Sequence, residues 1–180
     1  MATTAMNDVL TRYFDALEPG ASFTSRGRTI TEADLVGFSG LTGDWHPQHA
    51  DEVWAATSPF GERIAHGMLL ISYAAGLVRF DPERVVALRR LSDVVFKRPV
   101  RIGDTIQVEG RVQACRPLDD ETGLVTWRWT VRTTRGEAAV RATVEVLWRR
   151  SPETQAPAAF DDDDAVGSGL VSTGYTPLPM

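Results

Sequence analysis

The feature that most constrains the fold is an uncharged stretch of 12 residues, Gly67 to Val78, near the middle of the chain. Its apolar residues occupy nearly the whole circumference of a helix, so Ala65–Phe80 is predicted to form a helix that other elements cover on most sides. The stretch is too short to span a bilayer, which needs about 20 residues. A chain of 180 residues has room for one domain around such a helix, but not for two full domains.

The second half of the chain has the composition to cover that helix. Four segments are rich in Val, Ile, Thr and Trp and partly alternate polar with apolar residues: 86–98, 105–115, 124–134 and 137–148. Alternation with a period of two is typical of half-buried strands. We therefore predict an α+β fold in which an antiparallel β-sheet is wrapped around a long central helix at about 66–80.

Shorter elements are expected before the central helix. They are a helix at 7–17, a strand at 22–30 and one or two helical turns at 50–56. Thr31–Asp34 has the sequence of a capping box, which predicts a helix from there to about Ser39. Gly40 and Gly43 are expected to break that helix, because glycine is a poor helix former.

The composition changes near Ser151. Residues 151–180 are polar and contain Pro, Gly, Ser and four consecutive aspartates, Asp161–Asp164. Such a segment buries too little apolar surface to form a core. We therefore predict one domain at 1–150, including its N-terminal helix, followed by an acidic C-terminal tail at 151–180 that is flexible or loosely docked.

Charge and cysteine content exclude several classes of partner. The net charge is −5, whereas a nucleic-acid-binding protein needs a clustered basic face. The N-terminus has no apolar segment of the kind that a signal peptide requires, and no membrane partner is expected. The single cysteine, Cys115, cannot form an internal disulfide, which favours a reducing, cytoplasmic location.

An acidic and a basic side chain flank Pro47 in the loop before the central helix. Asp44 and His49 are five residues apart, which is more than the spacing of one helix face. A bend at Pro47 would allow both side chains to point into one pocket. Such a pair can hold a water molecule between them, where one group takes its proton and the other directs protonation.

A second feature lies where the central helix begins. The first N–H groups of a helix have no partner within the helix, so they can bind an oxyanion. Gly67 has no side chain to keep a carbonyl group from approaching that backbone. The enolate that forms when water adds to a conjugated thioester needs a donor of this kind.

Three sequence blocks in order resemble the MaoC-like family of hotdog dehydratases, which includes the (R)-specific enoyl-CoA hydratases. The family pattern is Gly-Asp-aromatic-Asn-Pro-x-His, then His-Gly-Met about 17 residues on, then Phe-x-x-Pro-Val-x-x-Gly-Asp-Thr. The matching blocks here are Gly43–His49, His66–Met68 and Phe96–Thr105. They cover about 40–105, and the remaining strands to about 149 fit the same fold.

The resemblance implies roles for particular residues. Asp44 and His49 would be the catalytic pair, and the Gly67 amide would bind the thioester oxygen. Other residues at which the resemblance implies substrate contacts or a wall of the acyl tunnel are His66, Met68, Phe96 and Pro99. For His66, however, a structural role that fixes the loop is the favoured interpretation.

Two residues depart from the family. His46 stands where the family has Asn, and Ala75 stands where some (R)-hydratases have a serine that contacts the site. Both bear on which acyl group is bound.

The resemblance implies a single hotdog domain that adds water to an α,β-unsaturated acyl thioester, or eliminates it from a 3-hydroxyacyl thioester. No metal or redox cofactor is required, and the acyl group is carried on coenzyme A or an acyl carrier. Two alternatives stay open: a hotdog acyl-thioester hydrolase, and a non-catalytic acyl-binding partner subunit. A single hotdog unit leaves a sheet edge exposed, so a homodimer or higher homo-oligomer is expected.

Basic residues near the third block have two interpretations. They could contact the phosphates of a coenzyme A or phosphopantetheine carrier, or they could form a solvated strand face. These residues are Lys97, Arg98 and Arg101, together with Arg89 and Arg90.

Overall fold

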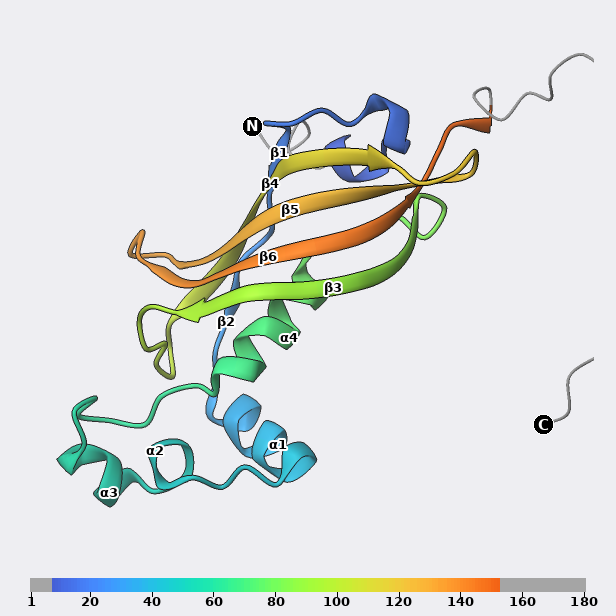
Figure 1. Cartoon of the computed structure of the whole chain (residues 1–180). Coiled ribbons are helices and arrows are strands. Elements are labelled where there is room, and N and C mark those ends of the chain that lie inside the picture. The colour runs from blue at the N-terminus through green and yellow to red at the C-terminus, as the bar shows by residue number, and fades with distance from the viewer. Residues whose placement is uncertain (1–7, 153–180) are drawn as a thin grey trace, which may run out of the picture.

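The computed structural model describes residues 8–152 and has one antiparallel sheet with helix α4 (Gly67–Leu77) lying against it (Figure 1). The strands are β1 (Ser22–Thr24), β2 (Arg28–Thr29), β3 (Val85–Phe96), β4 (Thr105–Pro117), β5 (Thr122–Thr133) and β6 (Ala138–Arg149). Their order across the sheet is β1-β4-β5-β6-β3, and β2 also pairs with β4. This arrangement is the expected α+β hotdog fold.

The four long strands form where the alternating pattern predicted them. In β5 the inward positions include Trp127 and Trp129, which are buried, while the intervening Arg128 is exposed. Trp148 from β6 packs beside Trp127, with ring centroids 6.0 Å apart. Large apolar side chains from neighbouring strands therefore form the core on the concave face of the sheet, where α4 lies.

Helix α4 begins as predicted but ends three residues earlier than expected. Val78 leaves the helical conformation, and the chain then runs into Pro82, whose ring disfavours a helical residue before it. The expectation that the helix is covered on nearly all sides is wrong for one face in the single chain. Met68, Ser72 and Gly76, four residues apart along the helix, are all exposed.

Polar contacts among Arg28, Asp34 and Tyr73 join α4 to helix α1 (Glu32–Thr42). The Tyr73 hydroxyl on α4 donates to the Asp34 carboxylate, and Arg28 both pairs with that carboxylate at 2.8 Å and stacks on the Tyr73 ring. Burial alone would raise the pKa of Asp34, but hydrogen bonds from Tyr73, Thr31 and Arg28 lower it to about 2. These contacts hold α1 against α4.

Helix α1 confirms the predicted capping box, with mutual hydrogen bonds between Thr31 and Asp34. The predicted break at Gly40 is wrong, because the helix continues through it to Thr42. It ends at Gly43, whose φ of 77° is a left-handed conformation that glycine adopts without strain. Two short helices follow, α2 (Pro47–Ala50) and α3 (Glu52–Thr57).

The predicted N-terminal helix at 7–17 is wrong; the segment forms two 3₁₀ turns, Asp8–Thr11 and Phe14–Ala16. One of its carbonyl groups bonds to a distant strand instead of within a helix, since the Trp148 indole donates to the Arg12 carbonyl at 2.8 Å. The Phe14 ring packs on Gly123, where a Cβ atom would lie 2.3 Å from the ring. Tertiary contacts therefore override the helical spacing.

The predicted strand at 22–30 is interrupted at Ser25–Gly27. Ser25 Oγ accepts a hydrogen bond from the Val108 backbone N–H at 2.9 Å, which satisfies a backbone group of β4 at the interruption. No helix within residues 8–152 is long and apolar enough to cross a membrane. The predicted acidic tail, apart from its first two residues, lies outside the described residues.

Candidate active site

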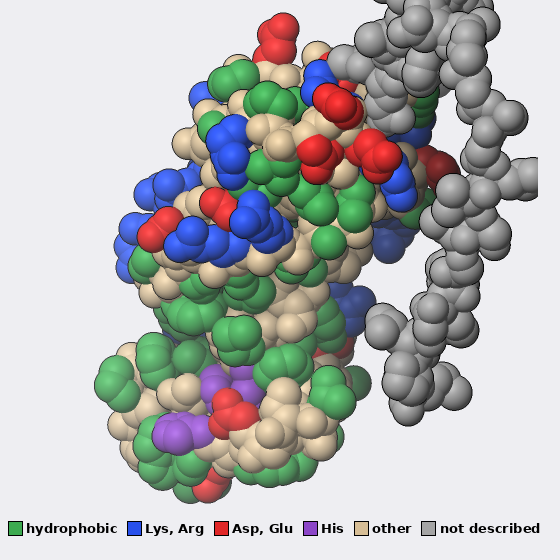
Figure 2. All heavy atoms as spheres, turned by 45° about the vertical axis from the view of Figure 1, so that its right-hand side comes forward, with side chains coloured by type: hydrophobic (Ala, Val, Ile, Leu, Met, Phe, Trp, Pro, Cys, Tyr) green, Lys and Arg blue, Asp and Glu red, His purple; other side chains and the backbone are tan. Residues whose placement is uncertain are grey.

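A pocket of about 450 Å³ opens where the N-terminus of α4 meets the α1–α2 loop and the segment after β3. Figure 2 shows the histidine side chains gathered with an acidic side chain in this region, below the part of the surface where Lys and Arg are concentrated. Its lining includes Asp44, Gln48, His49, His66, Gly67 and Phe96. Three segments far apart in the sequence thus form one site.

His49 is held by the short helix α2, which Pro47 begins. The His46 ring caps this helix, since its Nδ1 accepts from the Gln48 backbone N–H at 3.2 Å. The buried His49 donates from Nδ1 to the Ile64 carbonyl at 2.7 Å. A carbonyl oxygen can only accept, so Nδ1 carries the proton and the lone pair of neutral His49 is on Nε2. Burial lowers the pKa of His49, which favours this neutral form.

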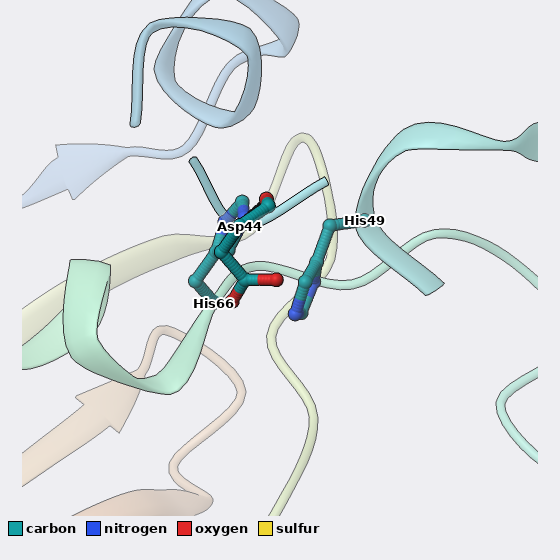
Figure 3. Close-up of side chains that lie close together, drawn as sticks. All are labelled: Asp44, His49 and His66. Atoms are coloured by element: carbon teal, nitrogen blue, oxygen red, sulfur yellow. Dashed lines mark hydrogen bonds between the residues drawn. The ribbon is translucent and has the colours of Figure 1, made fainter. Parts of the chain in front are cut away.

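Asp44 lies exposed at the mouth of the pocket, and a turn places it there. Its Oδ1 accepts from the His46 backbone N–H at 3.2 Å, and the Asp44 N–H donates to Thr42 Oγ1 at 3.2 Å. This turn brings the Asp44 carboxylate, His49 and His66 together, with one potential ligand atom of each within 4.8 Å of the others (Figure 3). The bend at Pro47 therefore does what the sequence suggested.

His66 contacts both members of the predicted pair. Its Nε2 lies 3.1 Å from the Asp44 carbonyl oxygen and 3.1 Å from Ser39 Oγ. Its ring stacks on His49 with centroids 3.8 Å apart. Because the carbonyl accepts, Nε2 of His66 carries the proton, and its buried Nδ1 has no hydrogen-bond partner in the described structure.

Two imidazoles and a carboxylate are a common ligand set for zinc or iron, so the Asp44–His49–His66 cluster is also a possible metal site. A metal ion must lie in the plane of each ring, along the nitrogen lone pair. The rings of His49 and His66 are stacked with their planes tilted by only 26° and their centroids 3.8 Å apart, so an ion within bonding distance of both rings cannot lie in both planes. The residues do not fit a metal ion unless one ring turns.

Gly67 is the first residue of α4, so its N–H has no partner within the helix. The Phe96 ring covers this glycine so closely that a Cβ atom would lie 2.7 Å from it. Met68 and Phe96 are more than half exposed beside the pocket, and Pro99 is half-buried. A side chain at residue 67 would therefore displace the Phe96 ring at this end of the pocket.

Residues 16–134 match the model of the MaoC-like domain. The chain belongs to this family.

Relatives of this MaoC-like chain include enzymes. It is 33% identical to the (R)-specific enoyl-CoA hydratase of Rhodospirillum rubrum, over 78% of this chain and 94% of that one. It is 40% identical to the MaoC protein of Klebsiella aerogenes over 69% of this chain, but spans only 40% of that longer protein. A solved structure from Archaeoglobus, titled a monoamine oxidase regulatory protein, has 37% identity and a TM-score of 0.74 over 78% of this chain and 96% of that one.

Of the residues that the sequence indicated for this MaoC-like site, seven line the pocket: Asp44, His49, His66, Gly67, Met68, Phe96 and Pro99. His46 and Ala75 do not line it. His46 packs edge-on against Trp54, with centroids 5.6 Å apart, and acts as a helix cap. Ala75 lies two turns along α4, against the core.

Gln48 was missed by the sequence analysis. It occupies the variable position of the first block, so only its polarity beside His49 could have indicated a role. In the structure it lines the pocket, and its side-chain nitrogen lies 3.0 Å from His49 Nε2.

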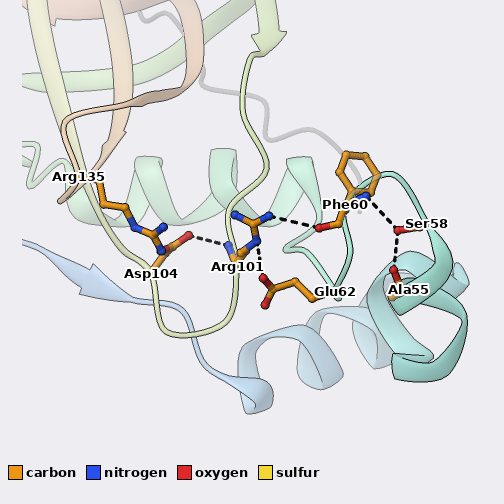
Figure 4. Close-up of polar contacts among 7 residues, drawn as sticks. All are labelled: Ala55, Ser58, Phe60, Glu62, Arg101, Asp104 and Arg135. Carbon is orange, nitrogen blue, oxygen red and sulfur yellow. Dashed lines mark hydrogen bonds and ion pairs between the residues drawn. The ribbon is translucent and has the colours of Figure 1, made fainter.

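The basic residues near the third block divide into two groups. Arg101 pairs with Glu62 at 2.6 Å and donates to the Phe60 carbonyl at 3.3 Å, which supports one wall of the pocket (Figure 4). Its guanidinium is therefore engaged within the protein. Lys97 and Arg98 are exposed and line the pocket.

Proposed function

We propose that this protein is a hydratase or dehydratase of acyl thioesters, and that Asp44 and His49 hold the reacting water. The proposal rests on one observation: Asp44 and His49 lie close together and line the same pocket as Gly67, whose N–H has no partner within the helix. Relatives named as an (R)-specific enoyl-CoA hydratase and a 3-hydroxybutyryl-CoA dehydratase support the same chemistry.

In the hydration direction, the water oxygen forms a bond to C3 of a trans-2-enoyl thioester. The electrons of the C2=C3 bond move into an enolate, whose oxygen is stabilised by the Gly67 N–H and the positive end of the α4 dipole. One proton of the water passes to the Asp44–His49 pair, and C2 takes up a proton to give the 3-hydroxyacyl thioester. These steps need only water and the thioester, so the proposal includes no metal or redox cofactor.

A spectrophotometric assay tests the proposal. Hydration of crotonyl-CoA, or of an enoyl-CoA of another length, removes the absorbance of the conjugated thioester without releasing free thiol. Thiol release from a saturated acyl-CoA would instead support the hydrolase alternative. Failure of both reactions over a panel of acyl lengths and branches would favour a non-catalytic acyl-binding role.

We also propose that two copies of the chain pair through β3. This strand is one edge of the sheet, and five apolar side chains on it are exposed: Val86, Leu88, Leu91, Val95 and Phe96. An uncovered apolar edge strand is a template for pairing with another chain. Light scattering should give twice the 19.8 kDa chain mass. Leu88→Asp should give the single-chain mass, whereas Val36→Asp, at an exposed apolar residue on α1, should not.

A further inference from the structure

The Gln48 side chain contacts His49, the proposed base, at Nε2. This is the ring nitrogen that must accept a proton in the reaction. The lone pair of neutral His49 is on Nε2, because Nδ1 donates to the Ile64 carbonyl. Gln48 Nε2 lies 3.0 Å from that atom. The carboxamide must therefore present its NH₂ group to His49 in the absence of substrate.

The backbone holds Gln48 in this place. Its N–H donates to the His46 ring at 3.2 Å, and its carbonyl accepts from the Ile64 N–H at 3.1 Å. The Ile64 carbonyl in turn accepts from His49. Gln48 and His49 are thus tied to the same residue, which keeps the base of the Gln48 side chain beside the His49 ring.

A carboxamide carries an NH₂ donor and a carbonyl acceptor on one rotatable, uncharged group. Its NH₂ can donate to neutral His49, and after a half-turn its oxygen can accept from Nε2–H of the protonated ring. A catalytic histidine that takes and returns a proton passes through both states. No apolar side chain at residue 48 could serve either state.

We infer that Gln48 is a positioning residue of the reaction: its amide donates to neutral His49 in the empty site, releases Nε2 to the reacting water, and turns to accept from His49 once the ring is protonated. This inference rests on the proposed hydratase function. The other charged or titratable groups that face His49 are Asp44, His46 and His66. The Asp44 carboxylate can only accept, while His46 Nδ1 and His66 Nε2 are already hydrogen-bonded to the Gln48 N–H and to the Asp44 carbonyl.

The test compares Gln48→Met, which removes donor and acceptor at nearly constant volume, with Gln48→Glu, which keeps only an acceptor. Gln113→Met, on the exposed part of β4, is the matched control. Two experiments are carried out on each protein. NMR titration gives the pKa of the His49 ring, and steady-state kinetics gives kcat and KM for an enoyl-CoA that the native chain hydrates.

Gln48→Met should lower kcat about tenfold, with KM within about twofold of native, since the interaction acts during proton transfer. Its His49 pKa should stay near the native value, because support for both protonation states is lost together. Gln48→Glu should raise the pKa of His49 by about one unit, since a carboxylate favours only the charged ring. The acid limb of its kcat/KM profile should move to higher pH by the same amount.

Native kcat in Gln48→Met would overturn the inference. So would a raised His49 pKa in that variant, because it would mean that Gln48 serves the neutral ring alone. An unchanged pKa in Gln48→Glu would show that residue 48 does not contact the ring. The titrations need no turnover, so a chain that hydrates no thioester would contradict the proposed function while the NMR data still decide the contact.

Discussion

The rings of His49 and His66 stack with their centroids 3.8 Å apart and a tilt of 26°, while His66 Nε2 also donates to the Asp44 carbonyl at 3.1 Å. One buried residue at the start of α4 therefore fixes both members of the proposed catalytic pair. It does so through its ring face and its N–H.

His66→Asn should lower kcat at least tenfold, because it removes the stacked ring and misplaces Asp44 by a fraction of an ångström. Binding of the thioester should change less, so KM should stay within about threefold. Steady-state kinetics with an enoyl-CoA checks this. Ser39→Ala, which removes only the other partner of Nε2 at 3.1 Å, is the control and should retain most of the activity. A larger loss in Ser39→Ala than in His66→Asn would contradict the account.

The pH dependence of stability follows from the lowered pKa of His49. Burial penalises the imidazolium, so the folded protein protonates His49 at a lower pH than the unfolded chain, whose ordinary value is 6.5. As the pH falls below 6.5, the unfolded chain binds the proton first, and the folded state loses stability. Urea unfolding should show this loss in the native protein and a smaller one in His49→Ala. Equal slopes in the two proteins would mean that His49 is not buried in neutral form.

Gly67→Ala should lower kcat/KM by about 100-fold, since the added methyl group meets the Phe96 ring and obstructs the approach to the helix N–H. The fold should tolerate the change, because the Phe96 ring is half exposed and can move. Thermal unfolding is therefore measured beside the kinetics. Gly76→Ala is the control, as a Cβ atom there meets nothing within 4 Å. Native activity in Gly67→Ala would remove this N–H from the mechanism.

Lys97 and Arg98 are the exposed cations that line the pocket. If they meet the phosphates of coenzyme A, Lys97→Gln with Arg98→Gln should raise KM for an enoyl-CoA about tenfold. The same pair of changes should leave KM for the N-acetylcysteamine thioester, which has no phosphate, unchanged. The CoA effect should weaken with added salt, which screens exposed charges. An equal rise for both thioesters would indicate a role in shaping the pocket instead.

The parts of the fold that could be predicted are those set by local pattern. Alternating residues such as Trp127, Arg128 and Trp129 predict their strand because each side chain points to the face opposite its neighbour's. The capping box at Thr31 is similarly local. The N-terminal turns could not be predicted, because the packing of Phe14 on Gly123 depends on the distant strand β5.

The candidate site could be predicted only as far as its motif. Asp44, His49 and Gly67 come together as the family pattern implied. The stacking of His66 on His49 and the contact of Gln48 with Nε2 depend on side-chain geometry that no spacing encodes. His46 illustrates the opposite case, since its departure from the family suggested a pocket residue, whereas its ring instead caps α2.

The central claim, that Asp44 and His49 together hold the water that adds to the double bond, is tested most directly by hydration kinetics of Asp44→Asn and His49→Ala. Both changes keep the pocket open, and circular dichroism confirms that each variant is folded. Each variant should lose at least about 1,000-fold in kcat for the enoyl-CoA, because either half of the pair alone cannot both hold and deprotonate the water. Near-native kcat in both folded variants would contradict the central claim.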